Sequence, residues 1–279
     1  MTEPRNRLIW RKLCSAKWVD SWEERLHWIG CERLAITQLS GSNGARLEIY
    51  DVTEKEAEIL KKQFGGEIRN LSRSTADWAR SIIQRKPISI RGKLLVTNAE
   101  PAPNQPDNLI FIPAGLAFGT GEHATTASCL RLLCDVAGGG RSFWSLLDVG
   151  TGTGILAIAA AKLGAKRIEA IDYDATAVKT AKQNCQLNGC SRIVRVRRAD
   201  ILKTDELGSY DVVTANLYGG LLGKAAPRLM RATQPGGCLI FSGILRDQVE
   251  EVIPSLRQLN LQIIETRTRG KWCAVLARK

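Results

Sequence analysis

Apolar and polar positions follow different patterns in two parts of the chain. Over the first 73 residues, short alternating runs and two helix-length stretches predict the order strand, helix, strand, strand, helix, strand. The strands are expected at 7–14, 33–39, 46–51 and 67–71, and the helices at 20–29 and 53–64. This order is typical of a small α+β domain of the ferredoxin-like kind.

From residue 109 onward, apolar strand-length runs alternate with helix-length segments. Strands are expected at 145–149, 167–171, 192–198, 210–215, 238–242, 261–266 and 272–277. Helices are expected at 155–163, 176–187 and 248–256. Regular alternation of this kind predicts an α/β domain with a parallel, Rossmann-like sheet, closed here by an antiparallel pair of strands.

A connecting segment separates the two parts. Residues 77–84 have a helical pattern, 88–96 have a strand pattern, and the window 97–108 contains three prolines and three asparagines. We therefore expect a ferredoxin-like domain at 1–73, a connecting helix, strand and linker at 74–108, and a larger α/β domain at 109–279.

Composition limits the classes of protein that fit. An apolar content of 44% is ordinary for a folded protein, and no apolar run is long enough for a signal peptide or a membrane span. Eight scattered cysteines without a Cys-x-x-Cys pair, and only two histidines, disfavour a zinc site and a disulfide scaffold. We expect a cytoplasmic monomer with reduced cysteines, no metal and no membrane contact.

The net charge of +12 adds a constraint on partners. A field of this sign accelerates association with polyanions, so it indicates an acidic partner or proximity to nucleic acid. A merely solvated basic surface is the alternative. The strand expected at 192–198 carries several of the arginines, and the same two interpretations apply to them.

The most informative stretch is the glycine-rich turn Asp-Val-Gly-Thr-Gly-Thr-Gly at 148–154. Gly150, Gly152 and Gly154 fall between a buried strand and a helix, where α/β sheets bind nucleosides. A dinucleotide fingerprint needs its third glycine at Ile155, so the spacing disfavours NAD. Asp172 ends the next strand, where an acid accepts hydrogen bonds from ribose hydroxyls. The alternative is that the glycines only close a tight turn and that Asp172 only starts a helix.

Two further stretches carry candidate chemistry. A glycine-bent loop runs into a helix at Thr125 and Thr126, which either border an anion site or simply cap the helix. The neighbouring His123 and Glu122 are weaker candidates for an acid–base pair, because no nucleophile motif accompanies them. Asn216 follows the strand at 210–215, at the sheet edge where ligands bind.

Taken together, these motifs resemble one family. The blocks are Gly-Leu-Ala-Phe-Gly-Thr-Gly-Glu-His-Ala-Thr-Thr at 115–126, the turn at 148–154, Ala-Asn-Leu at 215–217 and Ser-Gly-Ile-Leu at 242–245. They are similar to the PrmA family of class I S-adenosylmethionine-dependent methyltransferases, whose members methylate protein eleven of the large ribosomal subunit. The first block is not a general methyltransferase feature, which makes the resemblance specific.

The resemblance implies a set of site residues. S-adenosylmethionine contacts are expected at Thr126, Gly150, Asp172 and Asn216, with Phe118, Gly119, Gly152 and Asp200 beside the pocket and Gly154 completing the turn. Asn216 and the backbone of Phe118, Gly119 and Thr120 are expected to line the channel for the reacting amine.

The resemblance also implies the substrate and the roles of the domains. The expected activity is N-methylation of lysine or amino-terminal amines of a large-subunit ribosomal protein. The amino-terminal domain would hold that protein, and a transient contact with rRNA or the ribosome is expected.

Three alternatives stay open. A methyltransferase of another protein lysine, or of RNA, would use the same cofactor, and RNA as substrate would account for the charge. Asn-Leu-Tyr-Gly at 216–219 differs from the Asn-Pro-Pro-aromatic sequence of many nucleobase amine methyltransferases, which disfavours that chemistry. A non-catalytic cofactor-binding module would bind the nucleoside without turnover.

Overall fold

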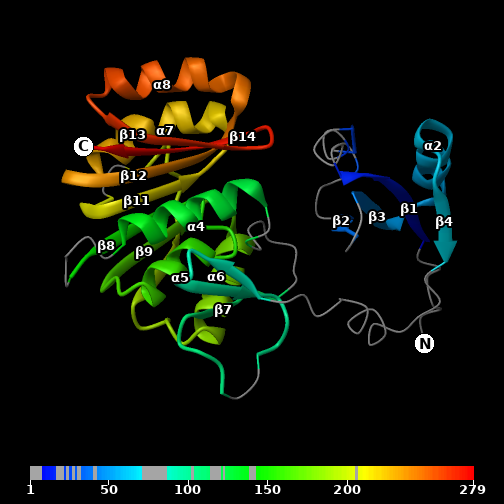
Figure 1. Cartoon of the computed structure of the whole chain (residues 1–279), viewed down its shortest axis with the longest axis horizontal. Helices are drawn as coiled ribbons and strands as arrows, with labels where there is room; N and C mark the ends of the chain where they lie inside the picture. The colour runs from blue at the N-terminus through cyan, green and yellow to red at the C-terminus, as the bar shows by residue number, and fades with distance from the viewer. Residues whose placement is uncertain are drawn as a thin grey trace. The chain divides into compact units, whose positions relative to one another are not determined.

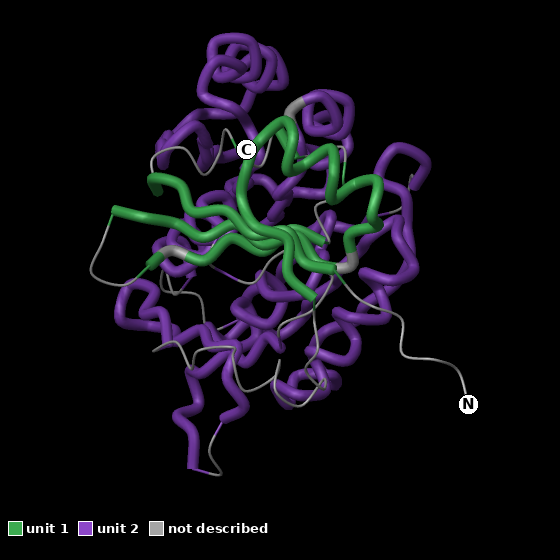
Figure 2. Tube along the Cα trace, turned by 90° about the vertical axis from the view of Figure 1, so that its right-hand side faces the viewer, with its two compact units in different colours: residues 1–83 green, residues 84–279 purple. Residues whose placement is uncertain are grey.

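The computed structural model describes residues 8–16, 22, 25–26, 29, 33–39, 43–70, 87–101, 104–113, 121, 123–137, 143–204 and 207–279. The chain divides into two compact units, residues 1–83 and residues 84–279, which are coloured separately in Figure 2. Each unit has its own buried core. The predicted roles of recognition domain, connecting segment and catalytic domain stay predictions.

The first unit contains a four-stranded antiparallel sheet with the order β2-β3-β1-β4. Its elements are β1 (Leu8–Ser15), β2 (Leu34–Gln38), β3 (Gly44–Val52), α2 (Glu54–Phe64) and β4 (Glu67–Asn70). The helix α2 begins at Thr53, which forms a capping box with Glu56. The strand order agrees with a ferredoxin-like sheet. The helix expected at 20–29 lies mostly outside the described residues, so the ferredoxin-like assignment itself stays a prediction.

The second unit is built on a seven-stranded sheet with the order β10-β9-β8-β11-β12-β14-β13 (Figure 1). Its strands are β8 (Ser145–Val149), β9 (Arg167–Asp172), β10 (Val194–Arg198), β11 (Tyr210–Asn216), β12 (Thr233–Leu245), β13 (Gln262–Arg269) and β14 (Trp272–Arg278). Strands β8 to β12 are parallel, whereas β14 is antiparallel to both β12 and β13. The predicted Rossmann-like sheet with an antiparallel end is confirmed.

Helices cover both faces of this sheet. One face packs against α4 (Ala124–Val136), α5 (Ile155–Lys162) and α6 (Ala175–Leu187), and the other against α7 (Gly219–Arg231) and α8 (Val249–Gln258). Successive strand residues point to opposite faces, so Leu146 belongs to the first core and Leu147 to the second. A short 3₁₀ helix, η4 (Arg246–Gln248), precedes α8.

One strand boundary differs from the prediction. Strand β12 begins at Thr233 instead of Cys238, because Thr233 already pairs with Tyr210 of β11. The register then shifts, and Val212 pairs with Cys238. The residues between, Gln-Pro-Gly-Gly, therefore lie in an irregular extension of the strand, although their composition is that of a turn.

The single strand expected at 88–96 is also wrong, because the structure has two strands there. Strands β5 (Ile88–Ile90) and β6 (Leu94–Thr97) form a hairpin, and β6 pairs in parallel with β7 (Leu109–Phe111). The hairpin turns at Arg91 and Gly92, whose φ angles of 54° and 65° are those of a primed turn. Lys93 Nζ donates a hydrogen bond to the carbonyl of Cys134 in α4 at 2.7 Å, which ties the hairpin to that helix.

In the part of the chain that the structure describes, no helix is long and apolar enough to cross a membrane. The described cysteines are free thiols, and most are buried, namely Cys129, Cys134, Cys185, Cys190 and Cys273.

Candidate functional site

The carboxyl ends of four neighbouring strands bring the predicted site residues to one edge of the sheet. In the order β10-β9-β8-β11, these ends lead to Asp200, Asp172, Gly150 and Asn216. From β8 the chain continues to β9 and β10 on one side and then crosses to β11 on the other. The boundary between β8 and β11 is therefore a topological switch point, where open α/β sheets bind ligands.

The glycine turn is folded back toward β9. Gly150, Gly152 and Gly154 have φ angles of 70°, 54° and 82°, a left-handed region that glycine adopts without strain. The backbone N–H groups of Gly150 and Thr151 donate to the carbonyl of Ile171 at 2.9 and 3.1 Å. Gly154 is the N-cap of α5 and offers no side-chain cap, and the N–H of Ala157 in the first turn of that helix donates to the carboxylate of Asp148.

Asp172 fixes this turn through its carboxylate. Its Oδ2 accepts a hydrogen bond from the N–H of Gly152, and its Oδ1 accepts one from the N–H of Asp174, both at 3.0 Å. The N-cap of α6 is Asp174, whose side chain accepts from the N–H of Thr176 at 2.8 Å. Asp172 therefore does more than start a helix. A carboxylate offers about four lone-pair positions, so two remain for hydroxyl donors.

A buried acid beneath the turn was not singled out from the sequence. Asp148 is 1% exposed, and its two oxygens accept hydrogen bonds from Thr151 at 2.6 Å and from Thr214 at 2.7 Å. Burial raises the pKa of Asp148 to about 6, while these hydrogen bonds oppose the rise. Its carboxylate thus joins the turn to β8 and β11. The sequence feature that could have identified Asp148 is that it is a single acid inside an otherwise apolar strand.

Asn216 and Thr126 are 90 residues apart in sequence and meet at this edge. The amide Nδ2 of Asn216 donates to the hydroxyl of Thr126 at 3.4 Å, and Thr126 is 1% exposed. Neither Thr125 nor Thr126 caps α4, because His123 is the N-cap and its ring accepts from the N–H of Thr125. The interpretation of these threonines as caps is therefore wrong.

Leu217 closes the site from the side of β11. A Cβ atom at Gly150 would overlap Leu217 Cδ2, and a Cβ at Gly243 would overlap the carbonyl oxygen of Leu217. The N–H of Leu217 donates to the carbonyl of Ser242 at 3.0 Å, which holds it in place. The two glycines thus let the chain after β11 lie directly on the turn. This role was missed, because it depends on contacts between distant segments.

The remaining predicted residues divide into two groups. Asp200 lies beside Asp172, since the N–H of the preceding residue, Ala199, donates to the Asp172 carbonyl at 2.9 Å. The Oδ1 atom of Asp200 accepts a hydrogen bond from the N–H of Leu202 at 2.9 Å. Phe118, Gly119 and Thr120 lie outside the described residues, as does Glu122. The amine channel that includes them stays a prediction.

Comparisons with known proteins agree with this geometry. The family model described as ribosomal protein L11 methyltransferase (PrmA) matches residues 29–279. The ribosomal protein L11 methyltransferase of Exiguobacterium sp. is 36% identical over 244 residues, which cover 85% of this chain and 77% of that protein. The ribosomal protein L11 methyltransferase of Geotalea uraniireducens is 40% identical over 208 residues, which cover 70% of this chain and 65% of that protein.

A solved structure extends the similarity to three dimensions. The crystal structure of ribosomal protein L11 methylase from Lactobacillus delbrueckii subsp. bulgaricus superposes with a TM-score of 0.60 at 31% identity. The superposition covers 70% of this chain and 100% of that one.

Proposed function

Because this chain belongs to the PrmA family of ribosomal protein L11 methyltransferases, we propose that it transfers methyl groups from S-adenosylmethionine to amines of ribosomal protein L11. The observation that carries the proposal is the arrangement at the switch point. There, Gly150, Asp172 and Asn216 meet at the carboxyl ends of β8, β9 and β11.

The residues at this edge fit S-adenosylmethionine. Asp172 keeps acceptor positions for two ribose hydroxyls after binding the turn. The glycine turn presents backbone without side chains, and at Gly150 a side chain would collide with Leu217. We propose that Asp172 holds the ribose, with Asp200 next to it, and that the turn at 150–154, Thr126 and Asn216 hold the remainder. When bound, this cofactor supplies a methyl group on a positively charged sulfur atom.

The protein's own contribution to the transfer is alignment and exclusion of water. Displacement at a sulfonium needs a neutral amine, and a lysine amine with a pKa of about 10.4 is neutral in only about one molecule per thousand at pH 7. Partial burial at the sheet edge favours the uncharged amine. We propose that Asn216, whose amide donates a hydrogen bond to Thr126, orients that amine. We propose that the backbone of Phe118, Gly119 and Thr120 lines the same channel.

The substrate groups and the division of labour are part of the proposal. Lysine side chains and the amino terminus of L11 are both amines that this chemistry accepts. We propose that residues 1–73 recognise L11, which is supported by the separate core around Trp10 and Leu47 in the first unit. We further propose that the protein acts as a cytoplasmic monomer.

The test is a methylation assay with three acceptors. The purified chain is incubated with labelled S-adenosylmethionine and with free L11, assembled large ribosomal subunits or bulk RNA. Label in free L11 is the expected result. Label in RNA alone would refute L11 as the substrate but keep the cofactor site, whereas bound cofactor without any labelled acceptor would refute the enzymatic role.

A further inference from the structure

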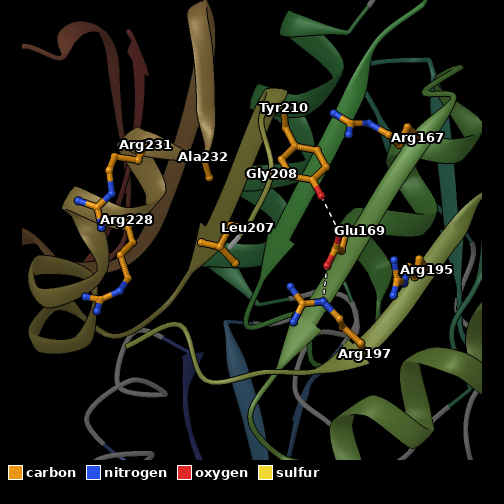
Figure 3. Close-up of a pocket in the computed structure, with 10 residues that line it drawn as sticks. All are labelled: Arg167, Glu169, Arg195, Arg197, Leu207, Gly208, Tyr210, Arg228, Arg231 and Ala232. Atoms are coloured by element: carbon orange, nitrogen blue, oxygen red, sulfur yellow. Dashed lines mark hydrogen bonds and ion pairs between the residues drawn. The ribbon is translucent and has the colours of Figure 1, made fainter. Parts of the chain in front are cut away.

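A basic pocket lies at the opposite edge of the large sheet, where the strands begin. Arg167 is the first residue of β9, Tyr210 is the first of β11, and Arg195 lies near the start of β10. Together with the end of α7 they border an open pocket of about 840 Å³. The pocket is lined by Arg167, Glu169, Arg195, Arg197, Leu207, Gly208, Tyr210, Arg228, Arg231 and Ala232 (Figure 3).

Strand alternation and a short connection explain why this pocket is open. Arg167 and Glu169 are on the same face of β9 as Ile171, which packs in the core beneath α7 and α8. The segment 199–209, which joins β10 to β11, has no helix among its described residues. On this face, α7 packs against β12, so the starts of β9 and β10 are left uncovered. Side chains on this face at the starts of β9 and β10 therefore reach solvent and can carry charge.

The charge of the pocket is strongly positive. Five arginines line it against one acid, and arginine stays protonated at any physiological pH. The acid, Glu169, is already engaged, because its Oε2 accepts from the Tyr210 hydroxyl at 2.6 Å and its Oε1 pairs with Arg197. Figure 3 shows Arg228 and Arg231 on one side of the pocket and Arg167, Arg195 and Arg197 on the other.

Part of this arginine set is held rigidly. The guanidinium of Arg167 lies over the Tyr210 ring, 4.6 Å from its centroid, and donates to the carbonyl of Ser209. The side chains of Arg195 and Arg231 are exposed, and within the described residues neither guanidinium makes a hydrogen bond or an ion pair, although Arg195 interacts with the charge of Glu169 at longer range. The pocket is thus lined both by a guanidinium held in place, that of Arg167, and by exposed guanidinium groups without a hydrogen-bond partner in the described part of the chain, those of Arg195 and Arg231.

Several features of the pocket favour a ligand with phosphate groups over a protein surface. Arg195 and Arg197 lie two positions apart on β10, so their side chains leave the same face of the strand at backbone positions about 6.7 Å apart, a separation similar to that of adjacent phosphates in a nucleic-acid strand. Guanidinium groups bind phosphate oxygens in bidentate geometry. Among the lining residues, Leu207 is the one large aliphatic side chain, and it is 6% exposed. A protein partner would need apolar anchors that this surface lacks.

We propose that this pocket binds the phosphate backbone of an RNA strand. Contacts of this kind are independent of base sequence and depend strongly on salt. The pocket also accounts for part of the net charge of +12, which methyl transfer does not require. The proposal is separate from the proposed methyltransferase activity, because the two sites lie at opposite ends of the strands.

The test compares two variants of the full chain with the same loss of charge. In Arg195→Gln/Arg231→Gln, two exposed pocket arginines are neutralised. In the control, Lys179→Gln/Lys182→Gln, two exposed lysines of α6 on the other face of the sheet are neutralised. Binding of a fluorescent twelve-nucleotide oligouridylate is measured by anisotropy across a series of NaCl concentrations, and circular dichroism with thermal unfolding checks that both variants are folded.

The pocket variant should flatten the slope of log K against log salt by about 1.4, since each lost contact to single-stranded nucleic acid contributes about 0.7. When wild type and variant bind RNA equally at 1 M salt, this difference in slope makes the variant bind on the order of 25-fold more weakly than the wild type at 0.1 M salt. The control should keep the wild-type slope. Equal effects of both variants, no RNA binding by the wild type, or tighter binding of polyglutamate than of RNA would each overturn the proposal.

Discussion

Replacing Asp172 by alanine should remove most of the affinity for S-adenosylhomocysteine and leave the second unit folded. The substitution deletes the carboxylate that accepts hydrogen bonds from the N–H groups of Gly152 and Asp174 at 3.0 Å. It also deletes the two acceptor positions that we assign to the ribose hydroxyls. The first loss acts on folding and on the shape of the turn, and the second acts on binding alone.

The magnitude follows from the number of hydrogen bonds. A hydrogen bond to a charged group contributes about 1.5–3 kcal/mol, so two ribose contacts are worth about 3–6 kcal/mol. At about 1.4 kcal/mol per factor of ten, the dissociation constant should rise by roughly 10² to 10⁴. Asp172 is half-buried, so water can reach the two N–H groups that lose their acceptor. We therefore expect a stability loss of only about 1–2 kcal/mol.

Isothermal titration calorimetry with S-adenosylhomocysteine measures the dissociation constant, and thermal unfolding measures stability. The matched control is Asp174→Asn, which removes the same charge two residues away and keeps the cap of α6, because asparagine caps helices as well as aspartate does. Its dissociation constant should stay within about threefold of the wild type. Should Asp172→Ala bind as tightly as the control, Asp172 would be a turn-forming residue without a role in binding.

Three further substitutions test other parts of the site. Asn216→Ala should lower the initial rate of L11 methylation by about 100-fold with little change in thermal midpoint, since its 3.4 Å bond to Thr126 is long; equal turnover would remove Asn216 from the site. Gly150→Ala should lower the thermal midpoint by roughly 4–10 °C, because φ at this position is 70° and because Leu217 must move. Adding Leu217→Ala should restore part of that loss. If the midpoint does not recover, the overlap with Leu217 is contradicted. Burial raises the pKa of Asp148 to about 6, so the contribution of Asp148 to wild-type stability falls as pH rises from about 4 to 6. In urea unfolding, Asp148→Asn should therefore gain about 3 kcal/mol relative to the wild type between pH 4 and pH 7, and a constant difference would refute the pKa.

The sequence predicted that Gly150, Asp172 and Asn216 gather at the carboxyl edge of the sheet, because the signals for each of them are local. Gly150, Gly152 and Gly154 identify a turn by composition, and Asp172 and Asn216 each follow a strand that is recognisable by itself. Because parallel strands end at one edge of a sheet, the sequence predicts that these residues meet even when the strand order is unknown. The strand order then decides which ends are neighbours, and it places the switch point between β8 and β11.

Features that depend on distant contacts were not predicted. The bond from Asp148 to Thr214 joins residues 66 apart, and the overlap that keeps a side chain off Gly150 comes from Leu217. Likewise, the strand expected at 88–96 divides at Arg91, a non-glycine residue with positive φ that no local rule favours. For Asp148 and Gly150, the partner that determines the conformation lies outside the window that a pattern can cover. The hairpin is local, and it was missed because its turn contains Arg91.

The two edges of the sheet have opposite chemistry, which has a consequence for their coupling. Strand β9 begins at Arg167 in the basic pocket and ends at Asp172 in the proposed cofactor site, and five residue steps of about 3.3 Å place these ends about 17 Å apart. This distance is about twice the screening length of about 8 Å at physiological ionic strength. The charge of RNA at the amino edge is therefore screened from the carboxyl edge. Raising the salt concentration should release RNA while the affinity for S-adenosylhomocysteine, which depends on short hydrogen bonds at the other edge, changes little.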